Sequence, residues 1–457
     1  MIPDAPKRAT SVRLNLARLA STNARTIAAM VLRLWGAFAS FVLTVLVARV
    51  AGASVTGHYA LAVSTVTLGA LFAVAGLDQI MVRAIGGDLR EGRTAEARAA
   101  LRATLRRVLT IGAVVAVITA LLAPWVAWVG GLPSVIALAT IAIVLSALLR
   151  ILNGGLRAAG AVMMSQALDG PVHSTLLLAG VLAMVVAQKP IDALVLVAGY
   201  DLCLAAACLL AWVTLRNQIR GWSREAFRAP GRWTDGWTLL VAGGGQVLVA
   251  WLLMVLVGAL LGPDGVGAFR VAVQVITMIS LFLTTIEGLV SPQFAGDFRV
   301  GDTRAAWRRH REATLLMAAS AVVPIVLCLF WPRFILGLFG PEFLAAAVSL
   351  QIMAVGQLIN IATGPIGGLM VMSGRERYSL IFSLCGIAIA VALSLLLMPL
   401  YGMVGAAVAT AAATTFRNVA AFVVMWRARG AERRVWSNRD PTEPLAGAAT
   451  GTDGGAA

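Results

Sequence analysis

The stretch that decides the fold reads Leu46-Val-Ala-Arg-Val-Ala-Gly-Ala-Ser-Val-Thr-Gly-His-Tyr59, and it lies between two long apolar runs. A related stretch, Leu256-Val-Gly-Ala-Leu-Leu-Gly-Pro-Asp-Gly-Val-Gly-Ala-Phe269, occupies the same position in the second half of the chain. Three positions correspond at a spacing of 210 residues: Gly52 and Gly262, Gly57 and Gly267, and Tyr59 and Phe269. Because membrane carriers are often built from internal repeats, this duplication predicts two copies of one helical bundle and makes transport the first functional hypothesis.

The composition is that of a membrane protein. Hydrophobic residues make up 60% of the 457 residues and charged residues only 13%, unlike the balance of a soluble domain. A helix needs about 20 consecutive apolar residues to cross a bilayer, and it satisfies its own backbone hydrogen bonds there. We therefore expect an all-α polytopic membrane protein with about twelve transmembrane helices in two pseudo-symmetric six-helix bundles. The expected spans are 26–50, 55–83, 107–129, 133–158, 163–187, 191–215, 236–261, 266–291, 312–332, 345–372, 378–398 and 402–426.

The apolar runs divide the chain into five segments. These are a basic lead-in (1–25), a first bundle (26–215), a linker (216–235), a second bundle (236–426) and a tail (427–457) that is basic and then disordered. An even number of spans per bundle gives both bundles the same orientation, so the axis relating them is expected along the membrane normal. The polar lead-in is not a cleavable signal peptide, because the apolar run that follows it is long and contains Arg33.

The formal net charge of +16 is concentrated in alternate loops and at both ends of the chain. Arginines cluster in 90–107, 216–232 and 299–311, whereas the intervening loops are short and nearly uncharged. Positive loops stay in the cytoplasm, so we expect both termini to be cytoplasmic in the cell's inner membrane. The same arginines are expected to contact anionic membrane lipids, and their distribution argues against nucleic acid as a partner.

The cysteines give no sign of a disulfide framework or of a metal site. All four lie inside apolar runs, where small core side chains are expected, and no Cys-x-x-Cys pair is present. These four cysteines are Cys203, Cys208, Cys328 and Cys385. We expect no cofactor either.

Helix-breaking residues interrupt three of the expected spans, at Gly170-Pro171, Pro324 and Gly364-Pro365. One interpretation is close helix packing with tolerated kinks. The other is bending of the helices during alternating access. The residues alone do not decide between the two interpretations.

Three segments of the first half resemble a known family: Val47–Gly52, Gly57–Ala60 and Gly76–Arg83. They are similar to the apolar-Ala-Arg-x-x-Gly turn, the Gly-x-Tyr helix start and the Gly-Leu-Asp segment of oligosaccharide-lipid flippases of the polysaccharide-export type. These flippases belong to the superfamily of multidrug, oligosaccharidyl-lipid and polysaccharide exporters. The usual Gly-Pro-acid turn of that family is present here only as Gly262-Pro-Asp264. The expected spans are also fewer than those of peptidoglycan-precursor flippases, which lowers the expectation of a peptidoglycan role.

The resemblance implies a fold like that of the multidrug and toxin exporters, a V of two bundles around a central cavity. It also implies the cargo, a polyprenyl-diphosphate-linked glycan that is moved from the inner to the outer leaflet for polysaccharide biosynthesis. Alternating access would be the mechanism of this movement. Polysaccharide polymerase and export machinery are the partners that such a role implies.

A diphosphate-linked glycan requires cationic groups in a water-filled cavity, because its charge cannot enter lipid unaided. Arginine suits phosphate, since its planar fork donates two parallel hydrogen bonds. Arg33 lies inside the first expected span and Arg270 inside the eighth, where they contact substrate phosphate or, alternatively, snorkel or form structural ion pairs. The further candidates are Arg49, for which an interfacial position fits better, Arg150 and Arg417.

Acidic residues inside the spans are candidates for a gate or for coupling to an ion. Asp78 with Arg83, and Glu287, lie at similar depths in the second span of each half, where gate or inter-helix ion pairs are the simpler explanation. Asp201 lies in the middle of the sixth span, where a buried carboxyl either cycles a proton or is a satisfied structural acid. His173 in the fifth span is a packed polar residue or a proton relay.

Polar amides inside the second half are candidates for contacts with sugar hydroxyls. They can equally form inter-helix hydrogen bonds, and the sequence does not separate these two interpretations. The four amides are Gln246, Gln274, Gln357 and Asn360.

Two other functions are compatible with the apolar architecture. A cation-coupled multidrug or metabolite antiporter of the same superfamily would be favoured by an acidic cavity, whereas the deep arginines favour an anionic cargo. A membrane glycan polymerase, ligase or glycosyltransferase would need an extended loop for an acceptor and a catalytic group. The outer loops are short, and the cytoplasmic loops contain no His-Glu-x-x-His or phosphate-binding motif, so we do not expect an enzyme.

Overall fold

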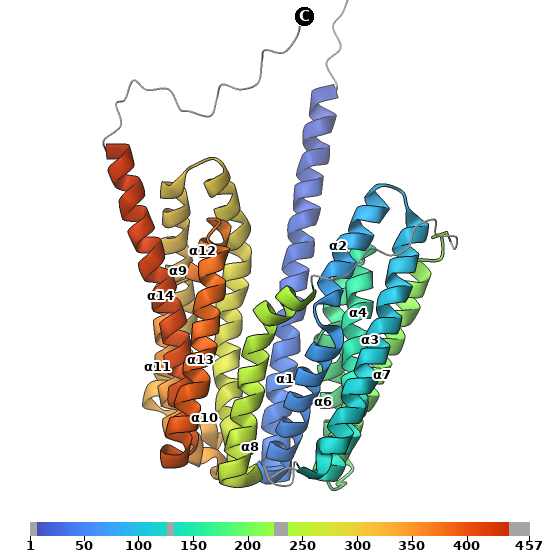
Figure 1. Ribbon diagram of the computed structural model, residues 1–457, viewed down its shortest axis with the longest axis vertical. Coiled ribbons are helices and arrows are strands. Elements are labelled where there is room, and N and C mark those ends of the chain that lie inside the picture. Colours follow the sequence, from blue (N-terminus) through green and yellow to red (C-terminus); the bar gives the residue numbers. More distant parts are fainter. Residues whose placement is uncertain (1–6, 126–131, 224–235, 438–457) are drawn as a thin grey trace, which may run out of the picture.

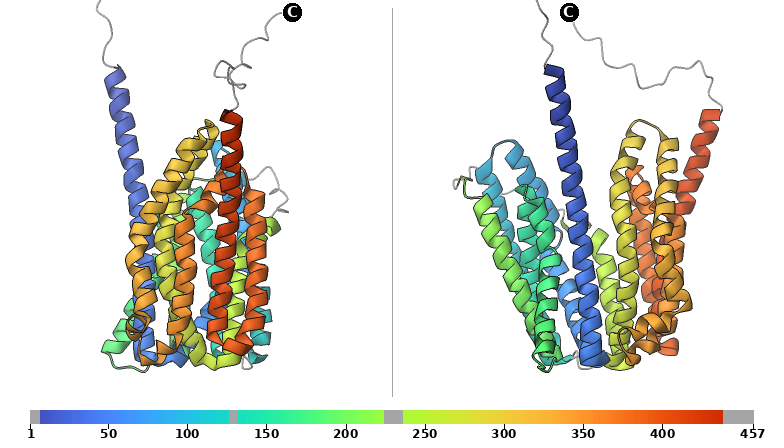
Figure 2. Two further views of the ribbon diagram at one scale, coloured as in Figure 1. Left: turned by 90° about the vertical axis from the view of Figure 1, so that its left-hand side faces the viewer. Right: turned by 180° about the vertical axis from the view of Figure 1, so that it is seen from behind.

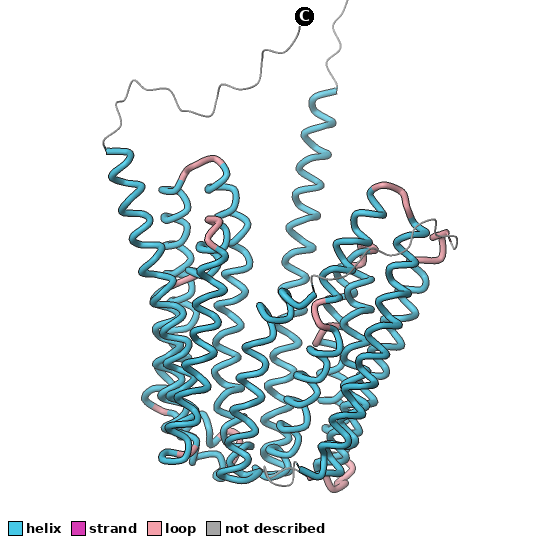
Figure 3. The backbone as a smooth tube through the Cα atoms, viewed as in Figure 1, coloured by secondary structure: helices cyan, strands magenta, loops and turns pink. Residues whose placement is uncertain are grey.

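The computed structural model describes residues 7–125, 132–223 and 236–437. Over these residues the chain consists of helices and short connections without a strand, as Figure 3 shows. The expected all-α fold is therefore confirmed. Residues 224–235 of the expected linker and 438–457 of the expected tail lie outside the described residues.

The first half of the chain is drawn in blue to green in Figure 1. Its described helices are α1 (Lys7–Val74), α2 (Leu77–Arg90), α3 (Thr94–Leu122), α4 (Pro133–Ala158), α5 (Val162–Leu168), α6 (Pro171–Val186) and α7 (Ala193–Gln218).

The second half is drawn in yellow-green to red. Its described elements are α8 (Gly236–Arg299), α9 (Thr303–Phe330), α10 (Pro332–Gly337), the 3-10 helix η2 (Pro341–Ala346), α11 (Ala347–Thr363), α12 (Ile366–Met372), α13 (Glu376–Tyr401) and α14 (Met403–Ser437).

Two glycines of the sequence repeat interrupt the longest helices, α1 and α8. Gly52 has φ 79° and Gly262 has φ 69°, values that residues with a side chain rarely adopt. Ten helical stretches of the described residues are long and apolar enough to cross a membrane. The two longest, Val31–Val74 and Gly244–Arg299, each contain one of these kinks. The total of twelve spans and the symmetry axis stay predictions.

The Gly-Pro steps at Gly170-Pro171 and Gly364-Pro365 separate helices, whereas Pro324 does not interrupt its helix. Pro171 is the first residue of α6, where its missing N–H costs no hydrogen bond, and Gly170 separates it from α5. Gly364, with φ 64°, ends α11. Pro324 lies inside α9, which continues to its end at Phe330, so the interruption expected there is wrong. Neighbouring groups can satisfy the backbone carbonyl that proline frees in a membrane helix.

The helices form two bundles that converge at one end of the molecule and diverge at the other, as Figures 1 and 2 show. The N-terminal end of α1, the C-terminal end of α14 and the loops after α2 and α8 lie at the diverging end. Each bundle has its own apolar core: Met81, Ile143 and Leu152 belong to the first, and Phe343 and Leu350 to the second. This arrangement is the V that the family resemblance implies.

The bundles meet at the converging end through backbone contacts between α1 and α8. A Cβ atom on Gly57 would lie 1.9 Å from the carbonyl oxygen of Pro263, and one on Gly267 would lie 2.1 Å from that of Ala53. Only glycine permits so close an approach. The contact is reciprocal, because Gly57 corresponds to Gly267 in the repeat and Ala53 corresponds to Pro263. We refer to these four residues as the closed end.

Two side-chain hydrogen bonds connect the segment of α10 and η2 to the closed end. Glu342 Oε2 accepts a hydrogen bond from the backbone N–H of Ala53 at 2.7 Å, directly after the Gly52 kink. Arg49 Nε donates to the carbonyl oxygen of Leu338 at 2.6 Å. Arg49 therefore joins the two halves of the chain in this conformation.

Candidate functional site

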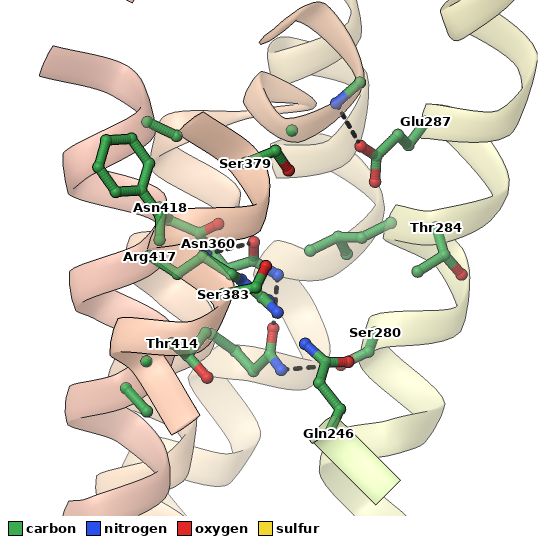
Figure 4. Close-up of a pocket in the computed structure, with 18 of the residues that line it drawn as sticks. Gln246, Ser280, Thr284, Glu287, Asn360, Ser379, Ser383, Thr414, Arg417 and Asn418 are labelled. Carbon is green, nitrogen blue, oxygen red and sulfur yellow. Dashed lines mark hydrogen bonds between the residues drawn. The ribbon is translucent and has the colours of Figure 1, made fainter. Parts of the chain in front are cut away.

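A cavity of about 730 Å³ lies inside the second bundle, between α8, α11, α12, α13 and α14. Figure 4 shows that its polar side chains come from several helices and point toward one another. On α8, the spacing of Ser280, Thr284 and Glu287 places all three on one helix face. Five residues that the sequence singled out line this cavity: Gln246, Glu287, Gln357, Asn360 and Arg417.

A chain of hydrogen-bonded amides crosses the cavity and joins three helices. Gln357 Nε2 donates to Ser280 Oγ at 2.8 Å, which links α11 to α8. Asn360 Nδ2 donates to Gln357 Oε1 at 3.0 Å, and Asn418 Nδ2 donates to Asn360 Oδ1 at 2.8 Å. Gln357 and Asn360 thus make inter-helix contacts, while their polar atoms also lie where a hydroxylated ligand could reach them.

Glu287 and Arg417 bring opposite charges into this cavity without forming an ion pair. Glu287 Oε1 accepts a hydrogen bond from the backbone N–H of Gly368 at 2.8 Å. Arg417 is influenced by the charge of Glu287, but the ion pairs of the described residues do not include this pair. The Arg417 guanidinium therefore keeps its capacity to bind an anion.

A smaller pocket of about 110 Å³ lies beside the closed end, between α1, α6, α7 and α8. Arg270 from α8 is partly buried there, and its Nη2 donates to Gln274 Oε1 at 3.2 Å. No carboxylate among the described residues forms an ion pair with Arg270. The other polar groups of the lining are neutral hydroxyls and an imidazole from the first half: Ser40, Thr44, Thr56, Tyr59, His173, Ser174 and Tyr200. The pocket is therefore a positive site without a compensating acid.

His173 and Asp201 both approach Tyr200 but do not bond to each other. The His173 ring meets the Tyr200 ring edge-on, with centroids 5.9 Å apart, and Asp201 is the next residue of α7. In the described part of the chain, His173 Nδ1 and both carboxylate oxygens of Asp201 are buried without a hydrogen-bond partner. A buried polar group without a partner is costly, so Asp201 stays a candidate for coupling.

The remaining predicted residues lie outside these two sites. Arg33 is exposed on α1 and Arg83 is exposed on α2. Arg150 on α4 is half-buried and is a cationic neighbour of Asp169. Asp78 accepts a hydrogen bond from the side chain of the next residue at 3.3 Å, and within the described ranges no ion pair joins it to Arg83.

Several polar residues of these sites are absent from the sequence-based candidates, and Asn418, Tyr59 and Tyr200 are three of them. Asn418 completes the amide chain, and its position directly after Arg417 was the available signal. Tyr59 belongs to the repeat that predicted the fold, yet nothing in the repeat indicated that it lies beside Arg270. Tyr200 lies between Gly199 and Asp201 in an otherwise apolar run, and Asp201 was the only signal beside it.

Long apolar helices around polar interior cavities define a multi-pass membrane protein. The sequence profile of the family described as "Polysaccharide biosynthesis protein" matches residues 24–295, more than half of the chain. The chain therefore belongs to this family. A second profile, MatE, matches residues 245–396 in the second half.

A curated relative is the uncharacterized membrane protein MJ1068 of Methanocaldococcus jannaschii, which is 23% identical over 198 residues. The match covers 42% of this chain, and it spans only 36% of the length of that relative.

Solved structures with the same fold include two kinds of transporter. The multidrug transporter DinF-BH superimposes with a TM-score of 0.60 at 19% identity, covering 89% of this chain and 95% of the other. The lipid II flippase MurJ, in an inward closed conformation, gives a TM-score of 0.65 at 12% identity, with coverage of 88% and 87%. At these identities the likeness shows the fold alone. Together with the two profiles, it supports membership of the multidrug, oligosaccharidyl-lipid and polysaccharide exporter superfamily, and the solved neighbours named here are transporters and not enzymes.

Proposed function

We propose that the protein moves a polyprenyl-diphosphate-linked oligosaccharide from the inner to the outer leaflet of the cell's inner membrane for polysaccharide biosynthesis. The observation that supports this proposal best is Arg270, a partly buried guanidinium without a carboxylate partner in the described residues. A charge held inside a membrane protein needs a counter-charge or water, and a diphosphate supplies two anionic groups. Arg417 brings a second guanidinium into the second bundle, where Glu287 lines the same cavity without forming an ion pair with it among the described residues.

The proposed orientation places both termini in the cytoplasm. The loops after α2 and α8 lie at the diverging end of the bundles (Figure 1), and the helix ends that adjoin them carry the arginine clusters of 90–107 and 299–311, which are expected to be retained on the cytoplasmic side. In this conformation the bundles therefore diverge toward the leaflet in which the cargo is made. Release would require the closed end to separate, and polysaccharide polymerase or export machinery would receive the product.

The experiment is a flipping assay in proteoliposomes that contain a polyprenyl-diphosphate glycan, with leaflet exposure read by a membrane-impermeant lectin. Arg270→Gln is expected to abolish most of the movement, whereas Arg270→Lys retains the charge and part of the rate. Arg333→Gln is the matched control, since this exposed residue of α10 lies outside both cavities. Movement by Arg270→Gln at the rate of the unmodified protein would refute the assigned role.

A cation-coupled multidrug antiporter is the second candidate, and one observation favours it. Within the described ranges, Asp201 keeps both carboxylate oxygens buried without a hydrogen-bond partner, an arrangement suited to binding and releasing a proton or a cation. Export of a cationic dye driven by an imposed ion gradient, with no glycan movement in the same liposomes, would select this function over the flippase.

A further inference from the structure

A third cavity of the described residues, about 1230 Å³, lies on the outside of the second bundle, where α9 and α14 approach the diverging end of the molecule. It is separate from the amide-lined cavity and from the Arg270 pocket, and the proposed function uses none of its residues. Its lining includes four arginines and two tryptophans: Arg304, Arg308, Arg311, Arg429, Trp307 and Trp426.

Helix packing explains why a cleft forms here. The helix α11 packs against both α9 and α14 and so holds them apart, with Ala362 of α11 in the cleft lining. The three arginines of α9 recur every three or four residues and therefore share one face of that helix. On α14, Trp426 lies three residues before Arg429, on the same face.

The aromatic wall of the cleft is built from both helices. The Trp307 and Trp426 rings meet edge-on with centroids 6.1 Å apart. The Arg429 guanidinium lies 5.0 Å from the Trp307 ring centroid and 5.3 Å from that of Trp426, within cation–π range of each. Trp307 also packs against His310, whose Nε2 lies 3.1 Å from the carbonyl oxygen of Thr363 at the end of α11. These contacts preform the wall before any ligand binds.

The charge of the cleft is strongly positive. Its lining contains four arginines and one carboxylate, Asp302. Asp302 Oδ1 accepts a hydrogen bond from the backbone N–H of Ala305 at 2.8 Å and so caps the start of α9. Arg309 points elsewhere and forms an ion pair with Asp297 at 2.8 Å. The three arginines of the α9 face are exposed, and their charge favours an anionic ligand.

The position of the cleft identifies the kind of anion. The candidate spans of these helices are Thr303–Phe330 and Met403–Arg429, and the charged residues of α9 lie in its first ten positions, so the cleft lies where two membrane spans reach the polar boundary of the bilayer. Tryptophan is enriched at this boundary. In Figure 1 both helices lie on the side of the second bundle that faces away from the first, which is the side turned toward lipid. Leu315 and Phe422 continue the cleft with apolar surface.

We propose that this cleft binds the headgroup of an anionic membrane phospholipid. The guanidinium groups of α9 hold the lipid phosphate by bidentate hydrogen bonds, and the acyl chains follow the apolar surface beyond them. The bound lipid joins α9 to α14 at a point where these helices otherwise meet through Trp307 and Trp426.

The test measures lipid preference of the full-length protein in bilayers that contain spin-labelled phosphatidylglycerol or spin-labelled phosphatidylcholine. The variant replaces the three arginines of the α9 face: Arg304→Gln, Arg308→Gln and Arg311→Gln. The control replaces three exposed arginines of α3 and so removes the same charge: Arg102→Gln, Arg106→Gln and Arg107→Gln. A surface arginine contributes about five-fold to anionic-lipid association, so the α9 variant, which lacks three of them, should lose its preference for phosphatidylglycerol by about 100-fold, while the α3 control, whose arginines lie outside the cleft, loses less.

Two results would overturn the proposal. An equal loss in both variants would mean that net surface charge, and not the cleft, attracts the lipid. Displacement of labelled phosphatidylglycerol by soluble inorganic diphosphate at matched phosphate concentration would mean that the cleft recognises phosphate irrespective of a lipid anchor. The single variant Arg308→Gln repeats the comparison with the least change to the fold.

Discussion

The closed end offers a direct test of how the two bundles move. A Cβ atom on Gly57 would lie 1.9 Å from the Pro263 carbonyl oxygen, and such contacts below 3.0 Å are essentially never seen. The Gly57→Ala substitution therefore requires α1 and α8 to separate by about 1 Å at this point, because a backbone carbonyl has no rotamer through which it can move aside.

The size of the effect follows from the cost of over-packing. Inserting a methyl group into a well-packed contact costs about 1–3 kcal/mol. The contact is lost when the closed end separates, so the cost falls on the closed conformation and not on the open one. The population ratio of closed to open molecules should fall by about 5- to 150-fold. Gly267→Ala should act in the same direction, since its Cβ would lie 2.1 Å from the Ala53 carbonyl oxygen.

The assay is a distance measurement between spin labels on the two bundles at the converging end. Lys189→Cys in the connection after α6 and Arg333→Cys in α10 are suitable sites, because both side chains are exposed. The four free cysteines are first replaced by alanine. Gly57→Ala should add a population at longer distance, and the rate of cargo movement should change with it.

Gly288→Ala is the matched control, since Gly288 also lies in α8 but a Cβ there would meet nothing within 4 Å. The reasoning fails if Gly57→Ala leaves the distance distribution unchanged. It fails equally if the Gly288 variant produces the same shift, because helix propensity and not the inter-bundle contact would then be responsible.

Three further substitutions test single contacts. Glu342→Gln weakens the charge-assisted bond from η2 to the Ala53 N–H of α1 and should cost the closed conformation about 1 kcal/mol. In the spin-labelled protein, the longer-distance population of Glu342→Gln should be larger than that of the unmodified protein and smaller than that of Gly57→Ala. If this population does not rise, the bond does not restrain the closed end. Asn360→Ala removes the acceptor of the buried Asn418 Nδ2 and the donor to Gln357 Oε1, and it should lower the free energy of unfolding by about 1–3 kcal/mol in thermal denaturation. Gln79→Ala, on an exposed side chain, should not lower it, and equal melting temperatures would contradict the inter-helix role. Arg309→Ala breaks a half-exposed ion pair and should cost less than about 1 kcal/mol, so a large drop in melting temperature would show an unrecognised structural role.

The turns of this fold were predictable because the backbone itself requires particular residues there. A left-handed φ at Gly52 and Gly262, and a carbonyl packed on Gly57 and Gly267, leave a pattern that repeats in both halves. The sequence was a poorer guide to Pro324. Pro171 follows a glycine whose backbone conformation is not helical, whereas Pro324 lies within a continuous helix. The residue type alone does not distinguish the two cases.

The candidate site was predicted less well, because an apolar run does not reveal which way an internal charge points. Arg33 and Arg270 look equivalent in the sequence, yet Arg33 is exposed while Arg270 lies in a pocket with groups from three helices of the first half. The direction depends on how each helix is rotated against its neighbours. Asn418 and Glu342 act through partners far away in the chain, and such pairs leave no local pattern.

The repeat also explains why the Arg270 pocket belongs to the junction and to neither bundle alone. In the first half, Ala60 occupies the position that corresponds to Arg270, and it lines the same pocket. In the second half, Phe269 corresponds to Tyr59 but is buried in the apolar core, whereas Tyr59 lies beside the guanidinium. The corresponding positions of the two halves therefore have different roles in this pocket. The second half of the chain supplies the cation, and the first half supplies the hydroxyl and imidazole groups. Because the pocket adjoins the closed end, separating the bundles there must also separate these parts, and an anion bound by Arg270 would experience the movement directly.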